Sequence, residues 1–178
     1  MLLMLRGVAI MYAGEEIGMV DADPGILPNP PFDRAGRDGY RTPMQWDASP
    51  TGGFTTGEPW LPLVDTSSRN VADQRDDPGS LLALYRRLIR ARRSCAALER
   101  GEHRSIFGVA PEVLAWLRQT DEERVLVLLN TGNQPRACDL RRLEAALGEV
   151  LVATSAREGR VSLAELMLDP LEGLAIRI

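Results

Sequence analysis

The sequence predicts a short α/β segment followed by an all-β domain. Residues 8–12 read VAIMY, a continuously apolar run of the kind found in strands of parallel sheets. Residues 81–89 place apolar side chains at helical spacing. From about Arg104, short strand-like runs alternate with turn signals, a pattern typical of an antiparallel sandwich. With 178 residues, 44% of them apolar, the chain can bury a substantial core.

The N-terminal part contains a predicted strand and a long loop. Residues 1–6 read as the end of a helix that Gly7 stops, and the run 8–12 would need sheet neighbours on both sides. Residues 20–78 contain nine of the twelve prolines and no clear periodicity. A loop of this length is usually functional or disordered. Disordered linkers are poor in aromatic residues, so a functional loop is favoured by Phe32, Tyr40, Trp46, Phe54 and Trp60.

One helix and five strands are expected after this loop. Ser80 is the predicted N-cap of the helix, whose arginine-rich face, from Arg86 to Arg93, is expected to be solvated. The predicted strands are 105–109, 113–118, 124–130, 149–153 and 174–178. In the second of these, Leu114, Trp116 and Arg118 alternate with apolar residues, as in a half-buried strand. Residues 140–147 predict a short helix, and the pattern of 162–168 fits either helix or strand.

Composition excludes several classes of partner. The net charge is −4 and the pI about 5.1, and all 21 basic residues are arginine, so a nucleic-acid partner is not expected. The apolar N-terminal run is too short to span a bilayer, and no membrane association is expected. Cys95 and Cys138 are too few for a disulfide framework or a zinc site. We therefore expect neither a metal nor a cofactor.

The segment 36–47, which reads GRDGYRTPMQWD, is the most informative motif. With residues 5–19 (LRGVAIMYAGEEIGM), 53–62 (GFTTGEPWLP) and 77–89 (DPGSLLALYRRLI), it resembles the C-terminal part of α-glucosidases of glycoside hydrolase family 13, the α-amylase family. The resemblance is specific to about residue 93 and architectural beyond it. It implies a remnant of a (β/α)₈ barrel, comprising strand 8, its long loop and helix 8. A small antiparallel β-sandwich domain follows.

The resemblance also sets the expected domains and partners. Residues 1–98 would be the C-terminal part of the catalytic barrel and residues 99–178 the β-sandwich. The substrate of the full-length parent would be an α-glucosidic oligosaccharide or disaccharide, hydrolysed by a retaining mechanism. The location implied is the cytoplasm of a bacterium.

The resemblance further implies that the catalytic groups lie outside this chain. Glycoside hydrolysis uses a pair of carboxyl groups that flank the scissile bond. In this family they come from barrel strands 4 and 5, and a third carboxylate follows strand 7 in an Asn-His-Asp motif. No Asn-His-Asp sequence is present, and the single histidine, His103, follows the predicted helix. We therefore expect the first seven β/α units to be missing and the chain alone to be inactive.

Arg41, followed by Arg37, is the predicted substrate-binding residue. A guanidinium fork can hold one carboxylate and still donate to a sugar hydroxyl. In exo-acting relatives an arginine of this motif pairs with an aspartate from the first β/α loop and holds the terminal glucose. The sequence leaves open which arginine does so, and both could instead be structural.

The other candidate side chains have mainly structural expectations. Glu15 and Glu16 adjoin a strand end, and a salt bridge at the base of the loop is the favoured reading. The two aspartates of the motif, Asp38 and Asp47, are expected to brace the arginines or cap turns. Trp46 is expected to anchor the loop by packing, and His103 to be an ordinary histidine at a strand edge or surface.

Two other functions remain in competition. The parent enzyme could be a transglucosylating relative, such as a trehalose synthase or a sucrose isomerase, because these share the Arg-Thr-Pro-Met-Gln-Trp run. The chain could also be a non-catalytic β-sandwich module that packs against a partner.

Overall fold

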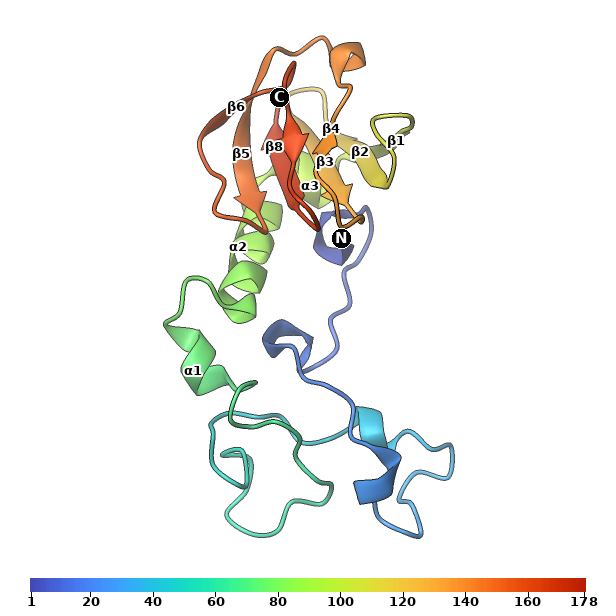
Figure 1. The fold of residues 1–178 in the computed structure, drawn as a ribbon, viewed down its shortest axis with the longest axis vertical. Helices are drawn as coiled ribbons and strands as arrows, with labels where there is room; N and C mark the ends of the chain where they lie inside the picture. Colours follow the sequence, from blue (N-terminus) through green and yellow to red (C-terminus); the bar gives the residue numbers. More distant parts are fainter. The chain divides into compact units, whose positions relative to one another are not determined.

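The computed structural model describes all 178 residues and divides into two compact units. One unit comprises residues 1–9 and 87–178, and the other comprises residues 10–86. The first is dominated by β-strands, whereas the second is built largely from loops and short helical turns (Figure 1). None of the helices is long and apolar enough to cross a membrane.

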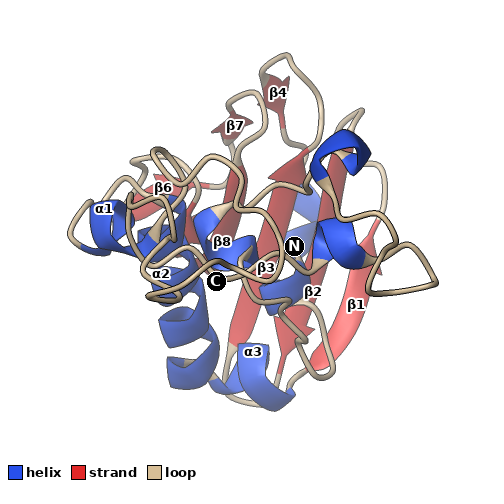
Figure 2. Cartoon of the chain, turned by 90° about the horizontal axis from the view of Figure 1, so that it is seen from below, coloured by secondary structure: helices blue, strands red, loops and turns tan.

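A six-stranded antiparallel sheet forms the first unit, with strand order β1-β2-β3-β8-β5-β6. Figure 2 shows β1, β2 and β3 side by side. A separate two-stranded sheet pairs β4 with β7. The bounds of the strands are β1 Glu102–Ile106, β2 Val113–Gln119, β3 Arg124–Asn130, β4 Arg136–Ala137, β5 Leu147–Ala153, β6 Arg160–Ser162, β7 Met167–Leu168 and β8 Gly173–Arg177.

The main core lies against one face of the large sheet. Alternate residues of β2, β3 and β8 point into it, as the two-residue period of strands requires. The small sheet and the segments next to it supply the opposite side. The buried residues of this cluster include Leu117, Leu126, Leu128, Ile176, Cys138, Leu140, Leu143, Leu163, Leu166 and Leu168.

The other face of the sheet is also covered. Trp116 and Arg118 of β2 lie on it, and both donate to the carbonyl oxygen of Met4, at 3.1 and 3.3 Å. Arg118 also donates to the carbonyl of Gly101, which follows helix α3 (Ala96–Arg100), and its side chain is fully buried. The expectation that this strand is half-buried was therefore wrong, because the N-terminal residues cover its second face.

The five expected strands all appear, with shifted bounds at several ends. The largest shift is in β1, which ends at Ile106 instead of continuing to residue 109. The short strands β4 and β6 were not predicted, since two- or three-residue strands carry too little periodicity to be detected. The segment 162–168, which fitted either helix or strand, contains no helix and ends in β7. The helix expected over 140–147 is reduced to a 3₁₀ turn at Arg141–Leu143, and β5 already begins at Leu147.

The second unit contains helix α1 (Val71–Arg75) and the first turns of α2 (Leu81–Ser94). Short 3₁₀ turns lie at Glu15–Ile17, Pro24–Ile26 and Asp38–Tyr40. The predicted cap of α2 is confirmed, because the Ser80 hydroxyl accepts a hydrogen bond from the N–H of Ala83 at 3.1 Å.

Residues 8–12 do not form the buried strand that their composition predicts. No strand is present there, and Val8 and Ile10 are 88% and 79% exposed. The helix expected before Gly7 is only a 3₁₀ turn at Leu2–Met4. A strand exists only through hydrogen bonds to neighbours, and this chain supplies none to residues 8–11.

Candidate functional site

The loop that carries Arg37 and Arg41 (the arginine loop) is shaped by a buried carboxylate. Asp38 is only 2% exposed, and its oxygens accept hydrogen bonds from the N–H groups of Phe32 and Asp33 at 2.8 and 3.0 Å. These bonds tie the start of the loop to the turn at Asp38–Tyr40. The expectation that Asp38 organises a turn is confirmed. Its carboxylate binds backbone N–H groups, however, and not an arginine side chain.

Asp33 is the residue that both arginines contact. It accepts from Arg37 Nε at 2.5 Å, and Arg41 Nη1 lies 3.2 Å from the same carboxylate oxygen. The Arg37 hydrogen bond, followed by that from the N–H of Ala35 and by the charges of both arginines, lowers the pKa of Asp33 to about 2. Asp33 therefore stays ionised, and the two guanidiniums share one negative charge.

Sequence reasoning missed Asp33. The signal was available in the spacing of Asp33 and Arg37, four residues apart, which the structure records as an ion pair. The run between them contains Gly36 and is not helical, so a helical i,i+4 rule gave no reason to join them.

Arg41 lines a cavity, whereas Arg37 does not. The cavity has a volume of about 330 Å³ and lies between the 3₁₀ turn that begins at Glu15 and the arginine loop. Its polar side chains come from Tyr12, Glu15, Asp21, Tyr40, Arg41 and Thr42. The wall combines a guanidinium, two carboxylates and hydroxyl groups, all of which can exchange hydrogen bonds with sugar hydroxyls.

The cavity wall depends on a close approach of two loop segments. The N–H of Ala22 donates to the carbonyl of Gly39 at 3.0 Å. A Cβ at position 39 would lie only 3.0 Å from the Ala22 oxygen. A side chain at position 39 would therefore push against the Ala22 carbonyl, and the close contact holds the segment that carries Tyr40 and Arg41 against the segment of Asp21.

Hydrogen bonds of backbone and polar side chains hold the long loop to the helices. The motif is linked to α1 by hydrogen bonds from the N–H groups of Val71 and Ala72 to the carbonyls of Gln45 and Trp46. Buried Asn70 caps α1 by accepting from the N–H of Asp73 at 2.8 Å. Gln74 donates to the carbonyl of Ile17 and accepts from the N–H of Leu82. The site is thus positioned mainly by hydrogen bonds.

The carboxylates that the sequence places after a predicted strand play different roles from those expected. Glu16 accepts from the N–H of Gly14 at 2.9 Å, which is a hydrogen bond to backbone and not the expected salt bridge. Glu15 and Asp21 are exposed on the cavity wall, and no hydrogen bond to either carboxylate is present.

The remaining candidates lie away from the cavity or serve turns. Asp47 accepts from the N–H of Ser49 at 2.9 Å, which confirms it as a turn cap. The side chain of Trp46 is 49% exposed. Phe32 and Trp60 form an aromatic pair, with ring centroids 6.1 Å apart. His103 lies in the edge strand β1, where its ring stacks on Trp116 at 6.0 Å. No group of three or more potential metal-binding side chains occurs.

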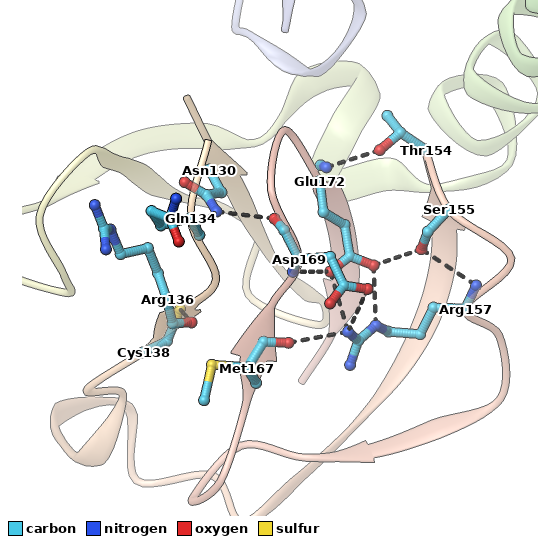
Figure 3. Close-up of polar contacts among 11 residues, drawn as sticks. Asn130, Gln134, Arg136, Cys138, Thr154, Ser155, Arg157, Met167, Asp169 and Glu172 are labelled. Atoms are coloured by element: carbon cyan, nitrogen blue, oxygen red, sulfur yellow. Dashed lines mark hydrogen bonds and ion pairs between the residues drawn. The ribbon is translucent and has the colours of Figure 1, made fainter. Parts of the chain in front are cut away.

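A second charged cluster lies within the β unit and is fully paired (Figure 3). Glu172, 3% exposed, accepts from both the Nε and Nη2 atoms of Arg157 at 3.0 Å, from the N–H of Asp169 at 2.9 Å, and from the Ser155 hydroxyl. Burial raises the pKa of Glu172, but these hydrogen bonds outweigh it and leave the pKa below its usual value. A carboxylate with all its acceptor sites used is a structural element.

The same view shows Asn130 closing a neighbouring turn. Its amide donates to the carbonyls of Gln134 and Asp169, both at 2.8 Å, and its oxygen accepts from the N–H of Gly132. Cys138 is buried nearby in the core, where burial raises the pKa of its thiol to about 11. This thiol is therefore protonated and unreactive at neutral pH.

Comparisons with known proteins match this chain over most of its length. The family model described as alpha amylase, catalytic domain, matches residues 1–101. A probable alpha-glucosidase from Rhizobium meliloti is 37% identical over 86% of this chain and 29% of its own length. An oligo-1,6-glucosidase from Heyndrickxia coagulans is 34% identical over 76% of the chain and 29% of its own length.

Solved structures of trehalulose synthase MutB have the same fold over nearly the entire chain. One of them, a mutant from crystals soaked with trehalulose, has a TM-score of 0.86 at 29% identity. The match covers 99% of this chain and 37% of the MutB chain. The enzyme from Pseudomonas mesoacidophila MX-45 gives a TM-score of 0.81 at 28% identity. The chain thus spans about a third of the length of these relatives.

Proposed function

Because this chain belongs to the alpha-amylase family, we propose that it forms the C-terminal part of a retaining α-glucosidase. The substrate would be an α-linked oligosaccharide or disaccharide. Residues 1–98 would close the catalytic barrel with strand 8, its loop and helix 8, and residues 99–178 would be the β-sandwich. The observation that carries the proposal is the cavity lined by Arg41 and shaped by the family-like loop 36–47.

Arg41 would be the substrate-binding residue, and Arg37 its support. Arg41 reaches the cavity and has its charge shared with Asp33, so its remaining N–H groups can donate to a sugar hydroxyl. Arg37 is anchored on Asp33 through Nε and Nη2 and does not line the cavity. Substrate contact by Arg37 in the complete enzyme is the competing assignment.

The chain alone would not hydrolyse glycosides. It has no Asn-His-Asp sequence, and the two carboxylates on the cavity wall are exposed and unsupported. Catalysis in this family of reactions requires a nucleophile and a general acid on either side of the bond. A cytoplasmic location remains a prediction that follows from the resemblance.

A chimera tests this function. The matching C-terminal segment of the Rhizobium meliloti probable alpha-glucosidase would be replaced by this chain, and hydrolysis of p-nitrophenyl α-glucoside would be measured. We expect the chimera to be active and the isolated 178-residue chain to be inactive. Activity of the isolated chain would contradict the proposal, as would a folded chimera with no activity.

The same chimera separates the two arginines. Loss of a charged hydrogen bond costs about 1.5–3 kcal/mol, so Arg41→Ala is expected to lower kcat/KM by about 10- to 100-fold. Arg37→Ala is expected to have the smaller effect. The reverse order would assign Arg37 to the substrate and Arg41 to its support.

Transglucosylation is the second candidate function. It is favoured by the TM-score of 0.86 against MutB, a trehalulose synthase for which sucrose is a substrate. The chimera separates the two functions when it is supplied with sucrose, because hydrolysis releases glucose and fructose whereas isomerisation leaves a disaccharide.

A further inference from the structure

The long loop of residues 20–78 carries an exposed pair of aromatic rings. Phe32 and Trp60 are 63% and 50% exposed, and their rings contact each other at an interplanar angle of 37°. The two residues come from separate parts of the loop, so the fold brings them together. Aromatic side chains gain much from burial, and a pair of them left at the surface marks an interaction site.

The backbone beneath the two rings is fixed. A proline directly precedes each of them in the sequence, and proline restricts the chain at that point. The N–H of Phe32 donates to the buried carboxylate of Asp38 at 2.8 Å, and Leu61, which follows Trp60, is buried. The rings are therefore held in place before any ligand arrives, which lowers the entropy lost on binding.

The aromatic pair adjoins the cavity through one residue. Asp33 follows Phe32 in the chain, and its carboxylate lies 3.2 Å from the Nη1 atom of Arg41, which lines the cavity. The same carboxylate accepts from Nε and Nη2 of Arg37. The side chain of Arg37 is itself half exposed, and no hydrogen bond of its Nη1 is present. Aromatic rings and free guanidinium N–H groups thus occur together beside the cavity.

This combination suits a sugar ring. A pyranose has apolar C–H faces, which pack against the negative face of an aromatic ring. It also has a rim of hydroxyls, which accept hydrogen bonds from a guanidinium. The core of a protein interface is depleted of charged residues, whereas Asp33 and Arg37 directly adjoin the rings. The surroundings of the pair therefore favour a carbohydrate over a protein partner.

We propose that Phe32 and Trp60 form a second sugar-binding subsite, which takes further units of an α-linked oligosaccharide whose terminal unit occupies the cavity. The cavity volume of about 330 Å³ is at the lower end for small-molecule pockets, so the units of a longer chain extend beyond it. The inference rests on the proposed function and narrows its substrate class from oligosaccharides or disaccharides to the longer oligosaccharides.

The test compares substrates of different length on the chimera described above. The values of kcat/KM are measured for maltose and maltotetraose, and for isomaltose and isomaltotetraose. We expect Phe32→Ala and Trp60→Ala to lower the ratio of the tetrasaccharide value to the disaccharide value by at least about tenfold, mainly through KM. Trp60→Phe keeps an aromatic face and should retain most of the wild-type ratio.

Phe54 supplies the matched control. It is an exposed aromatic residue of the same loop, but it makes no contact with another ring and does not line the cavity. Phe54→Ala should leave the ratio unchanged. An equal loss of the ratio in this variant would show that the effect is not specific to the aromatic pair and would overturn the inference.

A binding measurement separates this inference from the proposed function. Maltotetraose is titrated into the 178-residue chain by calorimetry, and Trp60→Ala should raise Kd by at least about tenfold. An active chimera whose ratio is unchanged by Phe32→Ala and Trp60→Ala, or that loses activity on both lengths equally, would reject the subsite and leave the proposed function standing. An inactive chimera, together with maltotetraose binding that depends on Trp60, would do the reverse.

Discussion

At the scale of single residues, burial and pairing decide roles that residue type leaves open. Arg92 belongs to a helix face that the sequence predicts to be solvated, and Arg118 belongs to a strand that it predicts to be half-buried. Arg118 is instead fully buried, and burial lowers the pKa of its guanidinium. Arg92 donates to the carbonyls of Leu3, Leu5 and Gly7 at 2.7, 2.8 and 2.5 Å. The acceptors come from residues more than eighty positions away, which no local pattern can indicate.

Glu172 provides a prediction at this scale. Because its pKa is lower in the folded chain than its usual value of 4.5, the carboxylate stabilises the fold above that pH and loses this effect as the pH falls toward the folded-state pKa. Glu172→Gln leaves Arg157 without its buried counter-charge and should lower the free energy of unfolding at pH 7 by about 3 kcal/mol.

The measurement is urea unfolding of both proteins between about pH 3 and pH 7, which includes the usual pKa values of carboxyl groups. The difference between wild type and Glu172→Gln should shrink as the pH falls below about 4. The exposed neighbour Glu165 supplies the control, and Glu165→Gln should stay within about 0.5 kcal/mol of wild type. A pH-independent difference at Glu172 would contradict the assignment.

At the scale of elements, local signals succeed where an element satisfies its own backbone. Helix α2 makes its backbone hydrogen bonds internally. Its apolar residues at helical spacing and its Ser80 cap are therefore enough to identify it from the sequence. The strands β2 and β3 pair with neighbours close in sequence, and they are also found. Residues 8–12 carry an equally strong apolar signal but find no neighbour, and they remain unpaired.

The N-cap of α2 gives the prediction for an element. Ser80→Ala removes the acceptor for the N–H of Ala83, as well as the donor that lies 2.8 Å from the carbonyl of Gln74. We expect a loss of about 1 kcal/mol in the free energy of unfolding. Ser80→Asp keeps a capping oxygen and should recover most of this loss, while equal destabilisation by both changes would show that the hydroxyl matters for another reason.

At the scale of the whole molecule, the two units differ in how they are held together. In residues 10–86, the buried hydrophobic residues are only Ile17, Ala22, Leu61, Val71 and Leu82, whereas the β unit contains a continuous apolar core. Hydrogen bonds of polar side chains, such as those of Asp38, Asn70 and Gln74, replace much of the missing apolar packing.

Hydrogen exchange tests this difference. Regions with few buried apolar contacts open at lower free energy than core strands. Amides of β3 at Val125–Leu128 should therefore exchange at least about 100-fold more slowly than those of the loop that carries Arg37 and Arg41. Equal protection of the two regions would show that the polar bridges are as effective as the core.

The sequence by itself determined the family, the arginine motif, the capped helix and the strands of the β unit. These features depend on short-range patterns and on residue types that a local argument can evaluate. Only the tertiary structure decided that Asp33 joins the two arginines, that Arg41 and not Arg37 reaches the cavity, and that Arg118 is buried beneath the N-terminal residues. The physical reason is that a charged side chain is governed by the partner that compensates it, and that partner is chosen by the fold.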